Sequence, residues 1–345
     1  MDKEQFQTIH EIGFTALQKK LSHYKGQNRE EIHLTAGESA SVLNYRPKTE
    51  GRILSASALY LEGVHFDLVY TPLQYLGHKL LTATLSRIYA MNGFPVLSHV
   101  DFAVPNKLSV SMIESICSGF DKTARDTGSG LSIGDITASH QFLGVGVHSS
   151  GKVSDAQMVK RDGCKTGDQI CVSGDLGAAM AGLRILLREK KSWQESGENK
   201  FKPDLQEYEY VVQRQLMPEA RADFIERLRE SSVKPTSMIE LSRGLLNEVQ
   251  LLMEASQTGC EIYTPSVPIS LETRKVADEM KEDVDKYAFY GGEDYEMLFT
   301  LRPEQVEKLK ADFEDFTVIG EVRDKAHGIK LHTGEGKAVD ISNGT

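Results

Sequence analysis

A predicted strand that runs into a glycine turn and then a helix could bind an anion. Residues 169–173 are expected to form the strand, Gly174-Asp175-Leu176-Gly177 the turn and residues 178–189 the helix. Backbone N–H groups at a helix start, together with the helix dipole, attract groups such as phosphate. The spacing is neither that of a P-loop nor that of a dinucleotide fingerprint, so a tight turn without a ligand is the alternative.

Two further segments carry side chains suited to binding or proton transfer. Residues 291–296 read Gly-Gly-Glu-Asp-Tyr-Glu, which predicts either a loop that presents acids to a ligand or a solvated acidic turn. His65 could act as a ligand or base, although a hydrogen-bonded structural histidine is the commoner case. A single sequence does not show which residues meet in space, so no catalytic triad is inferred.

Composition sets the class of protein. The chain has 345 residues, of which 40% are hydrophobic and 26% charged, and this favours a globular protein of two domains. A net charge of −10 argues against binding nucleic acid or an anionic membrane, while a local basic pocket could still bind small-molecule phosphates. We find no apolar run that would span a bilayer and no signal-peptide core, so a cytoplasmic location is expected. Four scattered cysteines predict reduced thiols.

Hydrophobic periodicity predicts an α+β chain. The polar, glycine-containing stretch 151–166 suggests a boundary between a domain of residues 1–155 and one of residues 156–345. Residues 191–206 are expected to form an exposed excursion, and the tail from Lys325 is expected to be polar and rich in glycine. Helices are expected over residues 4–24, 72–91, 109–127, 178–189, 218–230 and 244–256, and strands over 52–61, 96–104, 142–149, 169–173 and 296–301.

Several segments, taken in order, resemble the thiamine-monophosphate kinases of the aminoimidazole ribonucleotide synthetase superfamily. They are Glu62–Leu68, Ser86–Pro95, Gly134-Asp135, Arg161–Asp168, Gly174–Gly177, Pro218–Arg221 and Gly291–Phe299. The resemblance implies an N-terminal α/β domain with a dimerising sheet, a C-terminal α/β domain that completes the cleft, and a homodimer. It also implies transfer of the γ-phosphoryl group of ATP to thiamine monophosphate with the help of Mg²⁺.

The resemblance also implies roles for individual residues. Acids at metal-ligand positions are Glu38, Asp135 and Glu240. Residues expected to face the nucleotide are Gly134, Asp135, Arg161 and Ser242, and those expected to face thiamine monophosphate are His65 and Glu293.

Two arginines depart from the family pattern. Arg87 and Arg243 stand where the family has aspartates, and Ser39 and Ala58 replace two more acids. Magnesium prefers about six oxygen ligands, and a guanidinium repels it, so Mg²⁺ binding is expected to be weak. Arg87 and Arg243 are instead expected to meet phosphate oxygens.

Three interpretations follow from these substitutions. The chain could be a working kinase with fewer metals, in which Arg87 and Arg243 neutralise phosphate as an arginine finger does. It could be a non-catalytic paralogue that binds nucleotide or thiamine phosphate as a sensor or partner subunit. It could also be a structural dimer subunit with a vestigial cleft.

Overall fold

The computed structural model describes residues 51–334 and 336–341, together with Glu11, Leu17, Lys20, Leu21, His23, Tyr24, Ile32–Leu34 and Val42–Leu43. The chain divides into two compact units. Unit 1 comprises residues 1–88 and 93–155, and unit 2 comprises residues 89–92 and 156–345. The short strands β1 (Ile32–Leu34) and β2 (Val42–Leu43) pair antiparallel within unit 1.

Unit 1 contains a four-stranded sheet in the order β3-β6-β4-β5. The parallel pair is β4 with β5, and the other neighbours are antiparallel. Side chains alternate between the two faces of a strand, so Leu54 and Tyr60 are buried while Ile53 and Leu59 on the opposite face of β3 are exposed. The strands are β3 (Arg52–Leu61), β4 (Phe94–Pro105), β5 (Gly130–Ser139) and β6 (Gly144–Val153).

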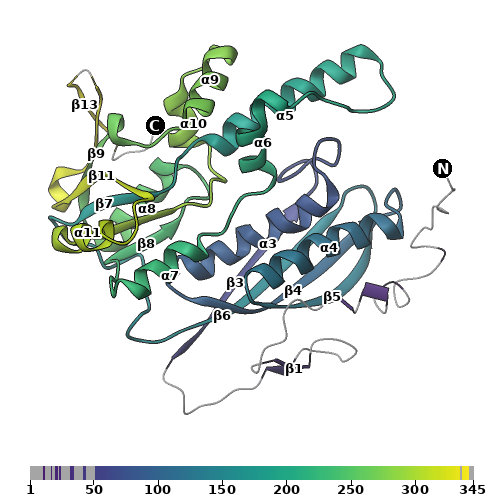
Figure 1. The fold of residues 1–345 in the computed structure, drawn as a ribbon, viewed down its shortest axis with the longest axis horizontal. Coiled ribbons are helices and arrows are strands. Elements are labelled where there is room, and N and C mark those ends of the chain that lie inside the picture. The colour runs from purple at the N-terminus through teal and green to yellow at the C-terminus, as the bar shows by residue number, and fades with distance from the viewer. Residues whose placement is uncertain are drawn as a thin grey trace. The chain divides into compact units, whose positions relative to one another are not determined.

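Helices α3 (Leu73–Tyr89) and α4 (Val110–Asp126) cover one face of this sheet (Figure 1). They touch through glycine. A Cβ on Gly77 would lie 2.1 Å from the carbonyl oxygen of Ile116, and one on Gly119 would lie 1.9 Å from that of Gln74. Ser109 caps α4 by accepting from the Met112 N–H at 3.3 Å, which satisfies one of the free donors of the first turn.

Unit 2 contains a seven-stranded sheet in the order β13-β12-β9-β11-β7-β10-β8. Neighbouring strands are antiparallel except the parallel pair β9 and β12. Every residue of β10 is buried, as expected for an inner strand covered on both faces. The strands are β7 (Gln169–Ser173), β8 (Ser237–Glu240), β9 (Gly259–Tyr263), β10 (Met297–Leu301), β11 (Phe316–Arg323), β12 (Ile329–His332) and β13 (Ala338–Asp340).

The helices of unit 2 bury apolar faces around this sheet, and one hydrophobic core cluster joins β7–β12 with α8 and α10. The helices are α5 (Ala178–Ser196), α6 (Glu209–Leu216), α7 (Ala222–Glu230), α8 (Leu245–Ser256), α9 (Leu271–Met280), α10 (Val284–Tyr290) and α11 (Pro303–Lys310). Short 3₁₀ turns are η1 (Gln206–Tyr208), η2 (Thr264–Ser266) and η3 (Lys325–His327). The four cysteines are free and buried. Among the described helices, none combines the length and apolar character needed to cross a membrane.

The α+β class is confirmed, and the expected strands at 52–61, 96–104, 142–149, 169–173 and 296–301 are present with small shifts at their ends. One expectation was wrong: α5 continues to Ser196, so residues 191–196 are helical and not part of an excursion. The sequence did not indicate strands β5, β8, β9 and β11–β13 or helices α6 and α9–α11. The helix expected over residues 4–24 lies mostly outside the described residues.

Candidate functional site

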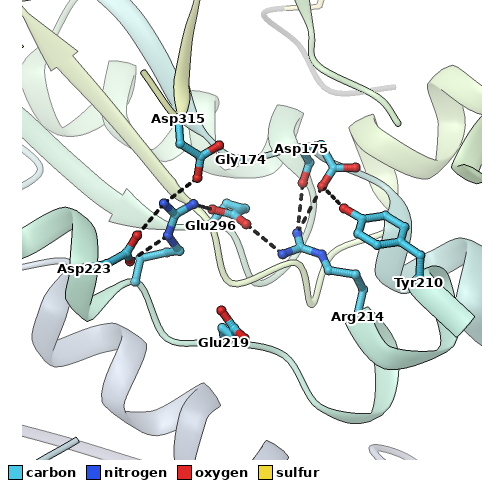
Figure 2. Close-up of a pocket in the computed structure, with 9 residues that line it drawn as sticks. Gly174, Asp175, Tyr210, Arg214, Glu219, Asp223, Glu296 and Asp315 are labelled. Carbon is cyan, nitrogen blue, oxygen red and sulfur yellow. Dashed lines mark hydrogen bonds and ion pairs between the residues drawn. The ribbon is translucent and has the colours of Figure 1, made fainter. Parts of the chain in front are cut away.

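A carboxylate buried inside unit 2 holds two arginines together (Figure 2). The side chain of Glu296 is 2% exposed and accepts from Arg214 Nη1 at 2.8 Å and from Arg221 Nη1 at 2.5 Å. Ser173 Oγ donates to the same carboxylate at 2.6 Å. A buried charge is tolerated only when it is paired, and here two cations share one acid. We call Glu296, Arg214, Arg221 and Ser173 the Glu296 clamp.

The clamp borders a cavity of about 420 Å³. Arg221 also donates to Asp223 at 3.0 Å and to Asp315 at 2.7 Å, and Arg214 donates to the carbonyl oxygen of Asp175 at 3.0 Å. Burial acts to lower the pKa of each guanidinium, but the nearby carboxylates, Glu296 first, raise it overall. Both arginines are therefore occupied by protein acceptors. The lining residues are Gly174, Asp175, Tyr210, Arg214, Glu219, Arg221, Asp223, Glu296 and Asp315, a set richer in acids than in cations and poorly suited to phosphate.

The N-terminus of α5 is occupied by a carboxylate of the protein itself. Asp294, which is 2% exposed, accepts from the Gly177 N–H at 2.9 Å and from the Ala179 N–H at 3.2 Å. Burial raises the pKa of Asp294 to about 7, against the lowering effect of Arg214 and of these two N–H groups. Gly174 has φ +55°, and a Cβ there would lie 2.4 Å from Glu296 Oε1. The glycine turn is therefore a packing turn, and its expected anion site is filled internally.

The loop that carries these acids has an unusual backbone. Glu293 and Tyr295 have φ values of +61° and +53°, a left-handed region that residues other than glycine rarely adopt. Backbone hydrogen bonds hold the loop, from the Glu293 N–H to the Ser242 carbonyl at 3.1 Å and from the Tyr295 N–H to the Leu241 carbonyl at 2.9 Å. Gln215 Nε2 donates to Glu293 Oε2 at 3.3 Å. Of its three acids, two are buried and Glu293 is half-buried, so the solvated acidic turn is wrong.

The segment between β8 and α8 gathers around a second buried acid. Glu248, in the first turn of α8, accepts from Ser242 Oγ at 3.2 Å and from the Arg243 backbone N–H at 3.1 Å. Arg243 Nε lies 3.4 Å from the same oxygen, while the Arg243 side chain is 61% exposed. Glu240 is buried at the end of β8 opposite Met297. Arg243 therefore has an internal partner and still faces solvent.

Unit 1 positions Arg87 against a strand. Arg87 lies in the last turn of α3, and its Nη1 donates to the carbonyl oxygen of Ser57 on β3 at 2.6 Å. The next residue along β3 is Ala58, one of the positions at which the resemblance implies an acid. Ser86 is buried and donates to the Thr82 carbonyl at 2.9 Å. The guanidinium of Arg87 is thus anchored on β3, beside Ala58.

A bulge between β4 and β5 places two aspartates side by side. Asp101 Oδ1 accepts from the Asp135 N–H at 2.7 Å, where the register between the strands shifts. A Cβ on Gly134 would lie 2.2 Å from Asp101 Oδ1, so glycine is required for this close approach. Both aspartates are exposed. Gly134 and Asp135 were predicted from the sequence to belong to the nucleotide site, whereas Asp101 was not predicted to belong to any site.

His65 and Arg161 are both exposed. His65 Nδ1 accepts from the Leu61 N–H at 3.0 Å, and its ring meets the Tyr60 ring edge-on at a centroid distance of 5.6 Å. This contact orients the ring in unit 1. Glu293, expected to share a ligand with His65, belongs to unit 2.

Comparison with known proteins identifies the family. Residues 37–153 match the N-terminal domain and residues 165–331 the C-terminal domain of the AIR synthase related proteins. The thiamine-monophosphate kinase of Bacillus subtilis (strain 168) is 32% identical over 269 residues, covering 77% of this chain and 78% of that protein. The chain belongs to the thiamine-monophosphate kinase family.

Solved structures of thiamine-monophosphate kinases agree with this assignment. The enzyme from Stenotrophomonas maltophilia K279a is 29% identical, with a TM-score of 0.75, and the match covers 90% of this chain and 93% of that chain. AaThiL, from Aquifex aeolicus, complexed with AMPPCP and TMP, is 27% identical, with a TM-score of 0.70 and coverage of 84% and 85%.

Mg²⁺ prefers about six oxygen ligands gathered at one point, with carboxylates supplying the charge. Within the described part of the chain, no three His, Cys, Asp or Glu side chains are placed to hold a metal ion. Of the expected ligands, Glu38 lies outside the described residues, Asp135 belongs to unit 1 and Glu240 to unit 2. Neither unit by itself therefore offers a fitting magnesium site among its described residues.

Sequence reasoning did not single out Arg214, Gln215 or Asp101. Arg214 and Gln215 lie in α6, a helix that was not predicted, so their approach to residues 293–296 could not be inferred. The one available signal was Arg221, which ends the Pro218–Arg221 segment of the resemblance and proves to be part of the Glu296 clamp.

Proposed function

We propose that this protein binds ATP and thiamine monophosphate on a thiamine-monophosphate kinase scaffold, and that it transfers the phosphoryl group weakly or not at all. The observation that carries the proposal is the anchoring of guanidinium groups at two positions where the family resemblance implies metal-binding aspartates. Arg87 is held by the Ser57 carbonyl and Arg243 by Glu248. Each cation is part of a hydrogen-bonded arrangement of its own unit.

Electrostatics supports the loss of metal-assisted transfer. Phosphoryl transfer depends on metal ions that neutralise charge developing on the transferred group. Replacing a carboxylate by a guanidinium reverses the local charge, and Ala58 next to the anchor of Arg87 provides no oxygen ligand from its side chain. Arg87 cannot swing freely to make room for an ion without losing its 2.6 Å hydrogen bond to Ser57.

The same arginines support binding of the ligands. Arginine binds phosphate oxygens through charge-assisted hydrogen bonds that need no metal. Arg243 contacts Glu248 through Nε, and its side chain remains 61% exposed, so its charge is accessible to an anion. We assign Gly134, Asp135, Arg161 and Ser242 to the nucleotide. AaThiL complexed with AMPPCP and TMP supports this choice of ligands.

Thiamine monophosphate is assigned to His65 and Glu293. His65 is exposed with its ring orientation fixed by the Leu61 N–H, and Glu293 is half-buried in a loop of constrained backbone. A carboxylate is suited to the cationic thiamine moiety and an imidazole to a phosphate. Preorganised groups of this kind lower the entropic cost of binding.

We further propose that the protein is a homodimer, as the family resemblance implies. Strand β3 is an edge of the unit 1 sheet, and its outward face exposes Ile53 (62%), Leu59 (64%) and Leu61 (40%). An exposed edge with apolar side chains is an aggregation hazard unless a partner covers it. A second copy of the chain, paired through this sheet, would provide that cover.

Two measurements test the proposed function. Isothermal titration with AMPPCP should give the same Kd with Mg²⁺ and with EDTA, and an assay coupled to ADP release should show little or no turnover of thiamine monophosphate. Rapid Mg²⁺-dependent turnover would instead identify a working kinase in which Arg87 and Arg243 take over charge neutralisation. Failure to bind either ligand would refute the proposal.

A double variant tests the physical cause. Arg87→Asp with Arg243→Asp should make nucleotide binding depend on Mg²⁺, because the reversed charges restore acids at both positions. Lys122→Asp with Arg125→Asp, on the exposed part of α4, matches the charge change away from the site and should leave Mg²⁺ dependence unchanged. An Arg87 and Arg243 variant that gains no metal response would contradict the assignment of these positions.

A further inference from the structure

Glu293 receives a hydrogen bond from a buried amide on a neighbouring helix. Gln215 is 5% exposed, and its Nε2 donates to Glu293 Oε2 at 3.3 Å. A half-buried glutamate has several rotamers of similar energy, so a fixed donor selects among them. The backbone of Glu293 is already constrained by its φ of +61° and by its N–H bond to the Ser242 carbonyl.

The helix that carries Gln215 is rigidly attached to the rest of unit 2. Arg214, its neighbour, donates to Glu296 at 2.8 Å and to the Asp175 carbonyl at 3.0 Å. One turn earlier, Tyr210 donates to Asp175 at 2.5 Å. On the face of α6 that carries Gln215, the helix packs closely on α5: a Cβ on Gly182 would lie 2.1 Å from the Val211 carbonyl oxygen and 2.9 Å from the Cβ of Gln215. Gln215 is therefore packed directly against α5, one residue along from the ion pair of Arg214.

Consecutive residues of α6 thus fix two acids of one loop. Arg214 holds Glu296, and Gln215 holds Glu293 three residues earlier in the chain. A binding group supported by packed neighbours keeps its geometry far better than one on an unsupported loop. Helix α6 therefore orients the side chains of Glu293 and Glu296.

We propose that Gln215 is a positioning residue that aims the Glu293 carboxylate at the cationic part of thiamine monophosphate. This inference rests on the proposed function. It assigns to Gln215 a role in affinity for the thiamine compound and none in affinity for the nucleotide. The amide also supplies hydrogen-bond donation to a carboxylate without adding a charge that would compete with the cationic ligand.

The test compares three variants by isothermal titration with thiamine monophosphate and, separately, with AMPPCP. Gln215→Leu removes the donor at similar volume, Gln215→Glu places a second carboxylate beside Glu293, and Gln213→Leu on the exposed face of α6 is the matched control. We expect Gln215→Leu to raise the Kd for thiamine monophosphate about ten-fold, equivalent to about 1.4 kcal/mol, with an unchanged Kd for AMPPCP. Gln213→Leu should leave both unchanged.

A structural readout separates positioning from general damage. Gln215→Glu should displace the Glu293 carboxylate, because two adjacent carboxylates repel each other. The crystal structure of Gln215→Leu, solved without ligand, should show the Glu293 carboxylate displaced. A Gln215→Leu variant that equals the control in Kd, or that keeps Glu293 in place, would overturn the inference alone. Wild-type protein that binds no thiamine monophosphate would overturn the proposed function and this inference with it.

Discussion

The buried Asp294 should make the protein less stable to unfolding as the pH rises from about 4 to about 7. Asp294 accepts two N–H groups at the start of α5, and burial raises its pKa from 3.8 to about 7. The folded state therefore binds this proton more tightly than the unfolded state does. Below pH 3.8 the carboxyl is protonated in both states and costs nothing. As the pH rises to 7, the unfolded chain ionises first, so stability is lost and then levels off.

The magnitude follows from the pKa difference. Each pH unit between the two pKa values costs about 1.4 kcal/mol and the slope lessens near pH 7, so the unfolding free energy attributable to Asp294 should fall by about 2 kcal/mol between pH 5 and pH 7. Asp294→Asn removes the ionisation but turns one acceptor oxygen into a donor facing an N–H, which costs about 1–2 kcal/mol at every pH. The variant should be less stable than wild type at pH 4 and more stable at pH 8.

Urea unfolding of both proteins at pH 4, 5, 6, 7 and 8 measures this crossover. Ser98→Ala removes the buried 2.7 Å hydrogen bond between the hydroxyls of Ser98 and Ser149, neither of which titrates, so its stability difference from wild type should not change with pH. A difference between Asp294→Asn and wild type that is constant from pH 5 to pH 8 would refute the reasoning, because the folded carboxyl would then ionise as easily as the unfolded one.

Three further predictions concern stability and assembly. Glu296→Gln leaves Arg214 and Arg221 without their shared acid, and urea unfolding should show a loss of about 3–5 kcal/mol; a loss under 1 kcal/mol would mean that the other acids compensate. Gly174→Ala should lower the melting temperature, because φ is +55° and the new Cβ meets Glu296 at 2.4 Å; an unchanged melting temperature would contradict this. Leu59→Lys should convert the proposed dimer to monomer in sedimentation velocity, and a variant of unchanged mass would exclude β3 as the interface.

The sequence predicted local structure best where one signal dominated. Alternating apolar residues identified β3, and the Asn92-Gly93 stop identified the end of α3. Strand β5 was missed because Gly134-Asp135 reads as a loop; in the structure this glycine fits the bulge where Asp101 approaches the backbone. Helix α6 was missed because its eight residues follow a polar stretch and are too few to show a helical period.

The candidate site was predictable as a set of positions and not as a set of contacts. The family resemblance located Arg87 and Arg243, but nothing in the sequence indicated that Ser57 and Glu248 would hold them. The glycine turn before α5 suggested an anion site from local geometry alone. Its occupation by Asp294 depends on a pairing of residues more than a hundred positions apart, which no local pattern encodes.

The glycine contact between α3 and α4 has a mechanical consequence for Arg87. Gly77 touches the backbone of α4 near one end of α3, and Arg87 lies ten residues further along, about 15 Å at 1.5 Å per residue. Over that length, a tilt of about 4° would move the guanidinium by about 1 Å. A methyl group added at Gly77 would push α3 away from α4 at that contact and tilt the helix. The tilt would displace the Arg87 guanidinium at the other end of α3.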